Sequence, residues 1–157
     1  MITFPTRLGT MALAATLLLA GAPAIARSAE DPAPADPSLL PVFHQFGDKP
    51  GLVALMEDFM TELVSDPRTR PFFADADQKH IKAELVDQFC VILGGPCQYT
   101  GKSMSEVHAK FGIHESEFNA LVEDLQIAMD KHSIPFRAQS KLLERLAPMH
   151  RQIITRP

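Results

Sequence analysis

Apolar residues recur every three or four positions along much of the chain, the spacing that places side chains on one face of an α-helix. The first such run begins near Asp48, where Pro50 suits a first helical turn, and ends at Asp66-Pro67. Its apolar positions are Leu52, Met56, Phe59 and Leu63. The pattern therefore predicts a helix of about five turns.

Two shorter helical runs follow. The first ends before Gly94 and has apolar residues at intervals of four, namely Ile81, Leu85 and Phe89. The second carries His108 and stops at Gly112. Glycine favours the end of a helix because it adopts backbone conformations that other residues avoid. The sequence thus predicts one medium helix and one very short helix in the middle of the chain.

The C-terminal third contains two more helical runs. A long helix closes near Pro135, with apolar positions Phe118, Leu121, Val122, Leu125 and Met129. The last helix is expected to be kinked by Pro148, with apolar positions Leu142, Leu143, Leu146 and Ile153. No segment alternates apolar and polar residues as a strand does. The sequence therefore predicts an all-α fold.

The first residues resemble a secretory leader. Arg7 gives a positive start, and residues 11–22 form an uncharged apolar run that is short for a bilayer core of about 30 Å. Ala24-Ile25-Ala26 has the small-x-small pattern of a cleavage site. We predict a signal peptide at residues 1–26, with a retained anchor as the alternative. Because no cysteine lies near the cut, we expect an exported, periplasmic protein with no stable membrane anchor.

The residues after the predicted cut divide into a linker and one domain. Residues 27–38 contain Pro32, Pro34 and Pro37, which favour extended, unpacked backbone. Residues 39–157 are long enough for a single hydrophobic core. The whole chain has 157 residues and a formal charge of −4, with no basic patch or run. We therefore expect no nucleic-acid partner.

A glycine-rich loop precedes a distinctive histidine. Residues 94–101 read GGPCQYTG, and two glycines and a proline cannot extend a helix. After this break, His108 shares a helical face with Met104, Val107 and Phe111. A single imidazole on an apolar stripe is a suitable axial ligand for a haem iron. The alternative is a partly buried histidine that is merely hydrogen-bonded.

These features occur together in a known family. Residues 39–157 resemble group 1 truncated haemoglobins, short globins built as a two-over-two helical sandwich. The resemblance rests on Asp58-Phe59, on the Phe72-Phe73 pair, and on the run GGPCQYTG, MSEVH and Phe111-Gly112-Ile113. It implies that His108 is the proximal iron ligand and that Phe73 wedges against the haem at a corner between helices.

The opposite side of the expected haem departs from the family pattern. Group 1 relatives usually carry a distal tyrosine, followed by a glutamine from the next helix. This chain has Met60 in the first place, and Ile81 and Leu85 on the corresponding face of the next helix. A missing hydrogen bond to a polar ligand costs about 1.5–3 kcal/mol. We therefore expect O₂ retention to be about 10- to 150-fold weaker, with a smaller effect on CO and NO.

The resemblance and the apolar stripes together define the expected haem pocket. Its predicted residues are Phe59, Met60, Phe73, His80, Ile81, Leu85, Phe89, Met104, Val107, His108, Phe111, Ile113 and Phe118. His108 is the predicted metal ligand. Either His80 or Met60 could fill the sixth iron position, as His/Met pairs do in electron-transfer haem proteins. The alternatives are a solvent-edge position for His80 and simple packing for Met60.

The two cysteines leave one structural question open. Cys90 and Cys97 are seven positions apart, and export to an oxidising compartment would permit a disulfide, although neither spacing nor family requires one. Neither belongs to a C-x-x-C-H pattern, so we expect non-covalent haem b. The remaining histidines have no metal-clasp spacing and are interpreted as surface groups, namely His44, His114, His132 and His150.

Three functional hypotheses follow from this pocket. The first is a haem globin that reversibly binds a diatomic gas, O₂, CO or NO. The second is a six-coordinate haem protein that exchanges electrons with a redox partner. The third is a haem-free globin-fold module that acts through protein contacts. The chain has no nucleophile elbow or phosphate loop, so any catalysis would be haem-dependent NO or nitrite chemistry.

Overall fold

The computed structural model describes residues 31–156. Its elements are η1 (Pro37–Leu39), α1 (Leu40–Gln45), α2 (Asp48–Ser65), α3 (Arg70–Phe73), α4 (Gln78–Ile92), α5 (Met104–His108), α6 (Glu115–Lys131), α7 (Phe136–Leu146), η2 (Ala147–Met149) and α8 (His150–Ile153). These residues contain no strand, which confirms the all-α prediction. The predicted leader, residues 1–26, lies outside the described range. Within residues 31–156, no helix has the length and apolar character needed to cross a membrane.

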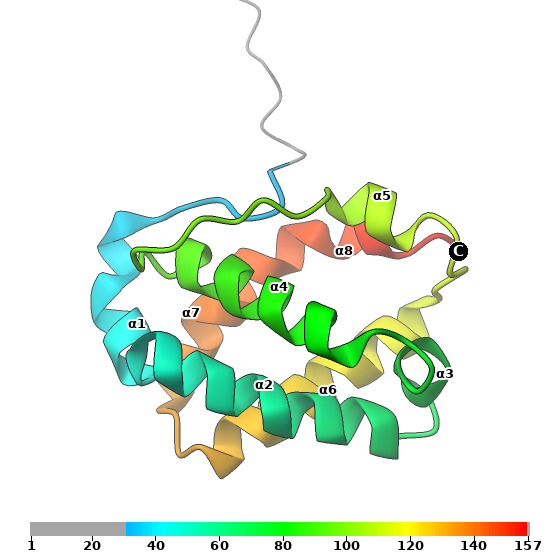
Figure 1. Ribbon diagram of the computed structural model, residues 1–157, viewed down its shortest axis with the longest axis horizontal. Coiled ribbons are helices and arrows are strands. Elements are labelled where there is room, and N and C mark those ends of the chain that lie inside the picture. The colour runs from blue at the N-terminus through cyan, green and yellow to red at the C-terminus, as the bar shows by residue number, and fades with distance from the viewer. Residues whose placement is uncertain (1–30, 157) are drawn as a thin grey trace, which may run out of the picture.

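The four longest helices form two layers (Figure 1). One layer contains α2 and α4, which pack side by side. The other layer contains α6, which contacts α2, and α7, which contacts α4. This arrangement is the predicted two-over-two helical sandwich. The short helices α5 and α8 contact each other at one edge of the sandwich. The fold thus places the helix that carries His108 beside the C-terminal segment of the described chain.

Helix α2 forms the centre of the core. It spans Asp48–Ser65, as the periodicity predicts, and follows Gly47, whose backbone is left-handed. Its buried face consists of Leu52, Leu55, Met56, Phe59, Met60 and Leu63. Burying one such side chain stabilises the fold by about 1.5–3 kcal/mol. The long apolar face explains why α2 can pack against both α4 and α6.

The predicted ends of the other helices are correct in part. Helix α4 ends at Ile92, just before Gly94, which has the left-handed φ of +75°. Helix α6 ends earlier than predicted, because the chain turns at Ser133 before it reaches Pro135. The last helix is broken into α7, η2 and α8 instead of being kinked, since Pro148 has no backbone N–H to continue the α-helical bonding.

The proline-rich segment is packed, and the prediction of unpacked backbone is wrong for residues 31–38. Ala33 is buried in the core, and the carbonyl of Pro32 accepts a hydrogen bond from Gln88 Nε2 at 2.6 Å. Asp36 pairs with Arg145 of α7. An extended proline-rich backbone makes no internal hydrogen bonds, so the Pro32 carbonyl, which lies before η1, is free to accept from a neighbouring side chain. We call residues 31–39 the strap.

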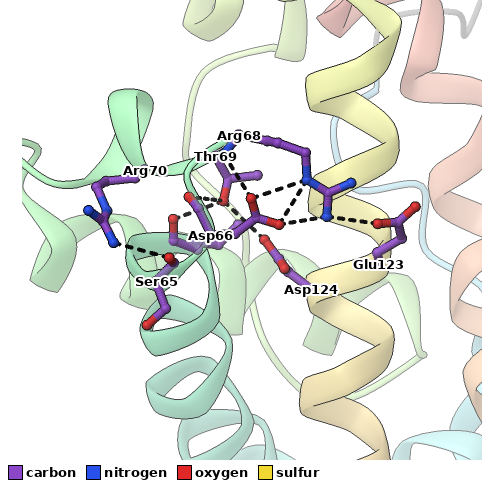
Figure 2. A network of polar contacts seen from close by, with 8 residues as sticks. Ser65, Asp66, Arg68, Thr69, Arg70, Glu123 and Asp124 are labelled. Atoms are coloured by element: carbon purple, nitrogen blue, oxygen red, sulfur yellow. Dashed lines mark hydrogen bonds and ion pairs between the residues drawn. The ribbon is translucent and has the colours of Figure 1, made fainter.

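A polar network joins the end of α2 to α6 (Figure 2). The Asp66 carboxylate accepts from the backbone N–H of Arg68 at 2.7 Å and from its guanidinium at 2.6 Å. The same guanidinium lies 2.8 Å from Glu123 of α6. Deeper in the interface, Thr69 Oγ1 and Asp124 Oδ2 are 3.0 Å apart. These contacts fix the turn that leads into α3.

Candidate functional site

Helix α5 is short but has a well-defined start. The Ser103 side chain accepts a hydrogen bond from the backbone N–H of Glu106 at 3.3 Å, and the Glu106 carboxylate accepts from the Ser103 backbone at 3.1 Å. This reciprocal capping box satisfies two backbone donors that would otherwise lack partners. The glycine-rich loop ends the preceding structure, so α5 can begin only after it. The box therefore sets the register that places His108 in the last turn of α5.

The imidazole of His108 is held in one tautomer. Its Nδ1 lies 2.8 Å from the backbone carbonyl of Met104, and a carbonyl can only accept, so Nδ1 must carry the proton and donate it. Burial lowers the pKa of His108 below its ordinary value, partly offset by this hydrogen bond. The ring is thus neutral at pH 7, with the lone pair of Nε2 free. That is the form of histidine that binds metals.

The predicted apolar stripe around His108 is buried unevenly. Met104 is buried, whereas Val107 is 41% exposed and Phe111 is 51% exposed. Phe111 presents a ring edge to both His108 and Phe72, with ring centroids 6.4 Å apart in each pair. One aromatic ring, that of the half-exposed Phe111, therefore lies beside the imidazole.

The predicted distal residues lie on α2, α3 and α4. Phe59, Met60 and Phe89 are buried, and the remaining three pack against the same core while staying partly accessible, namely Phe73, Ile81 and Leu85. None of these six side chains carries a hydroxyl or an amide. That these six side chains form the distal side of a haem pocket stays a prediction.

The other predicted pocket residues occupy different surroundings. The side chain of His80 is exposed, and its backbone N–H is capped by Asp77 at the start of α4, which agrees with a solvent-edge position. Phe118 packs edge-on against His150 of α8, with centroids 4.8 Å apart. Ile113 is buried where the chain enters α6. Phe118 and Ile113 therefore contact residues near the C-terminal end of the described chain, His150 and Thr155.

The loop before α5 is tied covalently to α4. Cys90 and Cys97 form a disulfide with a Cα–Cα distance of 5.9 Å, which answers the question that the sequence leaves open. Gly95 lies inside this loop, and a Cβ there would meet both Cys90 Sγ and the Phe43 ring at 2.7 Å. The disulfide and the glycine together hold the loop close to the core. The segment that leads to His108 therefore starts from a fixed point.

A family model for bacterial-like globins matches residues 41–155, nearly the whole described domain. The chain belongs to this globin family. The strap, with which the described residues begin, precedes the range that the family model matches. The globin assignment agrees with the two-over-two arrangement of α2, α4, α6 and α7.

Truncated haemoglobins are among the relatives in sequence. The chain is 28% identical over 114 residues to the group 1 truncated hemoglobin GlbN of Mycolicibacterium paratuberculosis, covering 73% of this chain and 84% of the relative. It is 30% identical over 84 residues to the group 1 truncated hemoglobin of Tetrahymena thermophila, covering 54% and 69%. These similarities support a haem globin that binds gas.

Solved structures share the fold. The Fe(III) form of truncated hemoglobin from Tetrahymena pyriformis superimposes with a TM-score of 0.69 at 21% identity, covering 72% of this chain and 97% of that one. The cyanomet 2/2 hemoglobin of Synechococcus, which has covalently attached heme, gives a TM-score of 0.66 at 19% identity, covering 73% and 97%. The comparison confirms the truncated-globin fold.

The donor set of the site suits a haem. It offers one neutral imidazole nitrogen, His108 Nε2, among apolar and aromatic side chains, as a large flat apolar ring with one iron requires. Both cysteines are consumed by the disulfide, so no thiol of the described chain is free to form a thioether link. Haem, when bound, would supply the iron that binds a diatomic gas.

Sequence reasoning missed one buried polar residue beside this site. Gln88 on α4 is buried and approaches the sulfur atoms of Met104 and Met149 from Nε2 at 3.8 and 3.9 Å. These partners lie 16 and 61 residues away along the chain. A glutamine one position before the periodic residue Phe89 resembles an ordinary polar helix position. The sequence contains no local signal that it faces inward.

Proposed function

We propose that this globin holds haem b non-covalently through His108 Nε2 and reversibly binds a diatomic gas on the opposite face of the iron. The observation that carries the proposal is the hydrogen bond from His108 Nδ1 to the Met104 carbonyl. It leaves Nε2 unprotonated and orients the ring, and it strengthens the imidazole as a donor. A histidine that is merely buried would make the same bond, so haem uptake through Nε2 is the test that separates the two roles.

The apolar distal residues favour some gases over others. With Met60, Ile81 and Leu85 in place of hydrogen-bonding side chains, a ligand with partial negative charge receives no donor from them. O₂ depends on such a donor more than CO or NO does, by about 1.5–3 kcal/mol. We therefore propose CO or NO binding, or transient O₂ binding, as opposed to oxygen storage. The low O₂ retention also argues against NO dioxygenation.

The place of action is proposed from the leader and the disulfide. Residues 1–26 have the composition of a signal peptide, and the disulfide between Cys90 and Cys97 is typical of proteins in oxidising compartments. We propose that the chain is exported and works in the periplasm. A fusion of the leader to a reporter that is active only after export tests this; a reporter that stays in the cytoplasm would contradict it.

Absorption spectra of residues 27–157 loaded with haem test the proposed site. We expect a five-coordinate ferrous form that binds CO, and loss of this spectrum in His108→Ala. His132→Ala is the matched control, because His132 is also partly buried but pairs with Asp58 at 2.7 Å on the α2–α6 side. It should leave the spectrum unchanged.

The same spectra distinguish the alternatives. A six-coordinate low-spin ferrous form would contradict an open gas site and would direct attention to Met60 or His80, which Met60→Leu and His80→Ala would separate. Failure of the folded protein to take up haem would overturn both haem proposals and leave a globin-fold interaction module. A spectrum that survives in His108→Ala would show that the iron has another ligand.

A further inference from the structure

The amide of Gln88 occupies an unusual place for a polar group. Its side chain, on α4, is 3% exposed and lies among the core residues of the sandwich. Nε2 donates to the Pro32 carbonyl of the strap at 2.6 Å, and the same nitrogen is 3.8 Å from Met104 Sδ and 3.9 Å from Met149 Sδ. An amide nitrogen has two hydrogens, so one remains for the sulfur atoms after the carbonyl has taken the other.

Met104 connects this amide to the proximal histidine. It is the first residue of α5, its side chain is buried, and its sulfur contacts Gln88. Its backbone carbonyl is the acceptor for His108 Nδ1. One residue therefore contacts Gln88 through its side chain and orients His108 through its backbone. The sulfur contact therefore acts at the same residue whose carbonyl fixes the imidazole.

We propose that Gln88 is a positioning residue for His108, acting through Met104. The proposal rests on the proposed function, because it concerns the ligand of the haem iron. A buried amide costs free energy unless its hydrogens are bonded, so an apolar residue would fill the same space at lower cost if packing were its only role. Gln88 instead joins α4, the strap, α5 and the η2 turn at one point.

The position of α4 gives this contact a functional meaning. The same helix carries Ile81 and Leu85, the predicted distal residues, on its N-terminal half. Gln88 lies one turn further along and reaches the helix of the proximal ligand. Helix α4 thus carries both predicted distal residues and an amide that contacts the helix of the predicted proximal ligand. The strap, which accepts from this amide, becomes part of the proximal support.

The chain offers a matched pair of variants for the test. Gln88→Met keeps the length and volume of the side chain but donates no hydrogen bond. Gln139→Met is the control, because Gln139 of α7 is 4% exposed and donates to Asp130 Oδ1 at 2.7 Å and to the Ile134 carbonyl at 2.9 Å. Both variants lose a buried amide, and both should therefore be less stable. Neither of these two hydrogen bonds of Gln139 involves α5.

The first measurement uses the protein without haem. Nitrogen-15 NMR at pH 8 gives the ratio of the Nδ1–H to the Nε2–H tautomer of His108. We expect Gln88→Met to lower this ratio by about 3- to 10-fold, the effect of weakening one hydrogen bond, and Gln139→Met to leave it unchanged. A merely structural role of Gln88 would change stability without changing the tautomer.

The second measurement uses the haem-loaded protein. In the ferrous form, Gln88→Met should shift or broaden the iron–histidine stretching band in the resonance Raman spectrum and speed haem transfer to an excess of apomyoglobin by about 3- to 10-fold. Gln139→Met should do neither. If Gln88→Met does not fold, Met104→Leu replaces it, since leucine keeps the backbone carbonyl and the apolar contact but removes the sulfur acceptor.

The outcomes separate this inference from the proposed function. Equal behaviour of Gln88→Met and Gln139→Met in both measurements would overturn the positioning role while leaving haem binding by His108 intact. Failure of the wild-type protein to bind haem would overturn the proposed function, and the tautomer ratio would still decide whether Gln88 orients the imidazole. A changed tautomer ratio with an unchanged stretching band would also contradict the inference.

Discussion

Replacing Asp124 with asparagine should stabilise the protein at neutral pH. Thr69 Oγ1 lies 2.8 Å from the Leu63 carbonyl and 3.0 Å from Asp124 Oδ2, and both contacts are buried. Figure 2 shows Thr69 and Asp124 facing each other. A hydroxyl has one proton, so it can donate to only one of these two oxygens. If Asp124 carries a proton, its carboxyl donates to Thr69, and Thr69 donates to Leu63. In the Asp124→Asn variant, the side-chain amide would donate to Thr69 in the same way at every pH.

The pH dependence follows from the direction of the Asp124 shift. Burial raises the pKa of Asp124 above its ordinary 3.8; the Thr69 hydrogen bond and Arg68 oppose this, while Asp66 and Glu62 add to it. Because the pKa is higher in the folded than in the unfolded protein, the contribution of Asp124 to stability is fully present below pH 3.8 and is lost as pH rises through the folded pKa. Above the folded pKa the charged carboxylate can no longer donate to Thr69.

The magnitude is that of one buried hydrogen bond, about 1 kcal/mol. We expect Asp124→Asn to be more stable than wild type by this amount at pH 7, about 4 °C in Tm, and equal to it near pH 3.5. Urea denaturation of both proteins from pH 3.5 to 8 measures the difference, in which groups common to both proteins cancel. Glu123→Gln is the control, since its pair with Arg68 is exposed and should contribute little to stability at any pH.

Two results would refute this reasoning. If Asp124→Asn were less stable than wild type at pH 7, the buried carboxylate would have to be stabilised in its charged form by Arg68. If the difference between the two proteins did not change with pH, Asp124 would not titrate differently in the folded and unfolded chain.

Three further predictions concern the site and its loop. Met60→Tyr should slow O₂ dissociation by about 10- to 150-fold in stopped-flow measurements, with little change for CO, because it restores a distal hydroxyl; equal rates in Met60→Tyr and Met60→Phe would contradict this. Replacing Cys90 and Cys97 with alanine should destabilise the protein by about 2.5 kcal/mol through loss of the short closed loop; dithiothreitol should lower the Tm of wild type but not of this variant. Gly95→Ala should cost about 1–3 kcal/mol, because its Cβ meets Cys90 Sγ and the Phe43 ring at 2.7 Å. The glycine substitution should cost less when Cys90 is already replaced by alanine, and equal costs in both backgrounds would rule out the sulfur as the obstacle.

The long helices can be predicted from the sequence because their own apolar periodicity defines them. Leu52, Met56, Phe59 and Leu63 are all buried on α2, as their spacing predicts. The short elements η1, α1 and α3 escape prediction, because a helix of three to six residues has too few positions to show a period. Helix α5 is equally short and is predicted only because glycines mark both of its ends. The sequence correctly predicts that Pro148 disturbs the last helix. It predicts a kink, whereas the structure has the 3-10 helix η2 between α7 and α8.

Some parts of the candidate site can likewise be predicted from residues close together in the sequence, whereas others depend on residues far apart in it. The loop at residues 94–101 and His108 lie close together in sequence, so a motif can identify them. The contact between Gln88 and Met149, and that between Thr69 and Asp124, join positions 61 and 55 residues apart. No pattern in one sequence pairs such positions, since each polar partner looks like a residue on a helix surface. His108 as the iron ligand stays a prediction until haem is bound.

The C-terminal segment has a consequence for how the site is completed during synthesis. Beyond α5, the backbone of Ile113 donates to Thr155 Oγ1 at 3.0 Å and accepts from the N–H groups of Thr155 and Arg156. Thr155 stands 42 residues after Ile113, so the nascent chain has made α5 and α6 long before these partners exist. These backbone partners of Ile113 therefore become available only after α6, α7 and α8 have been synthesised.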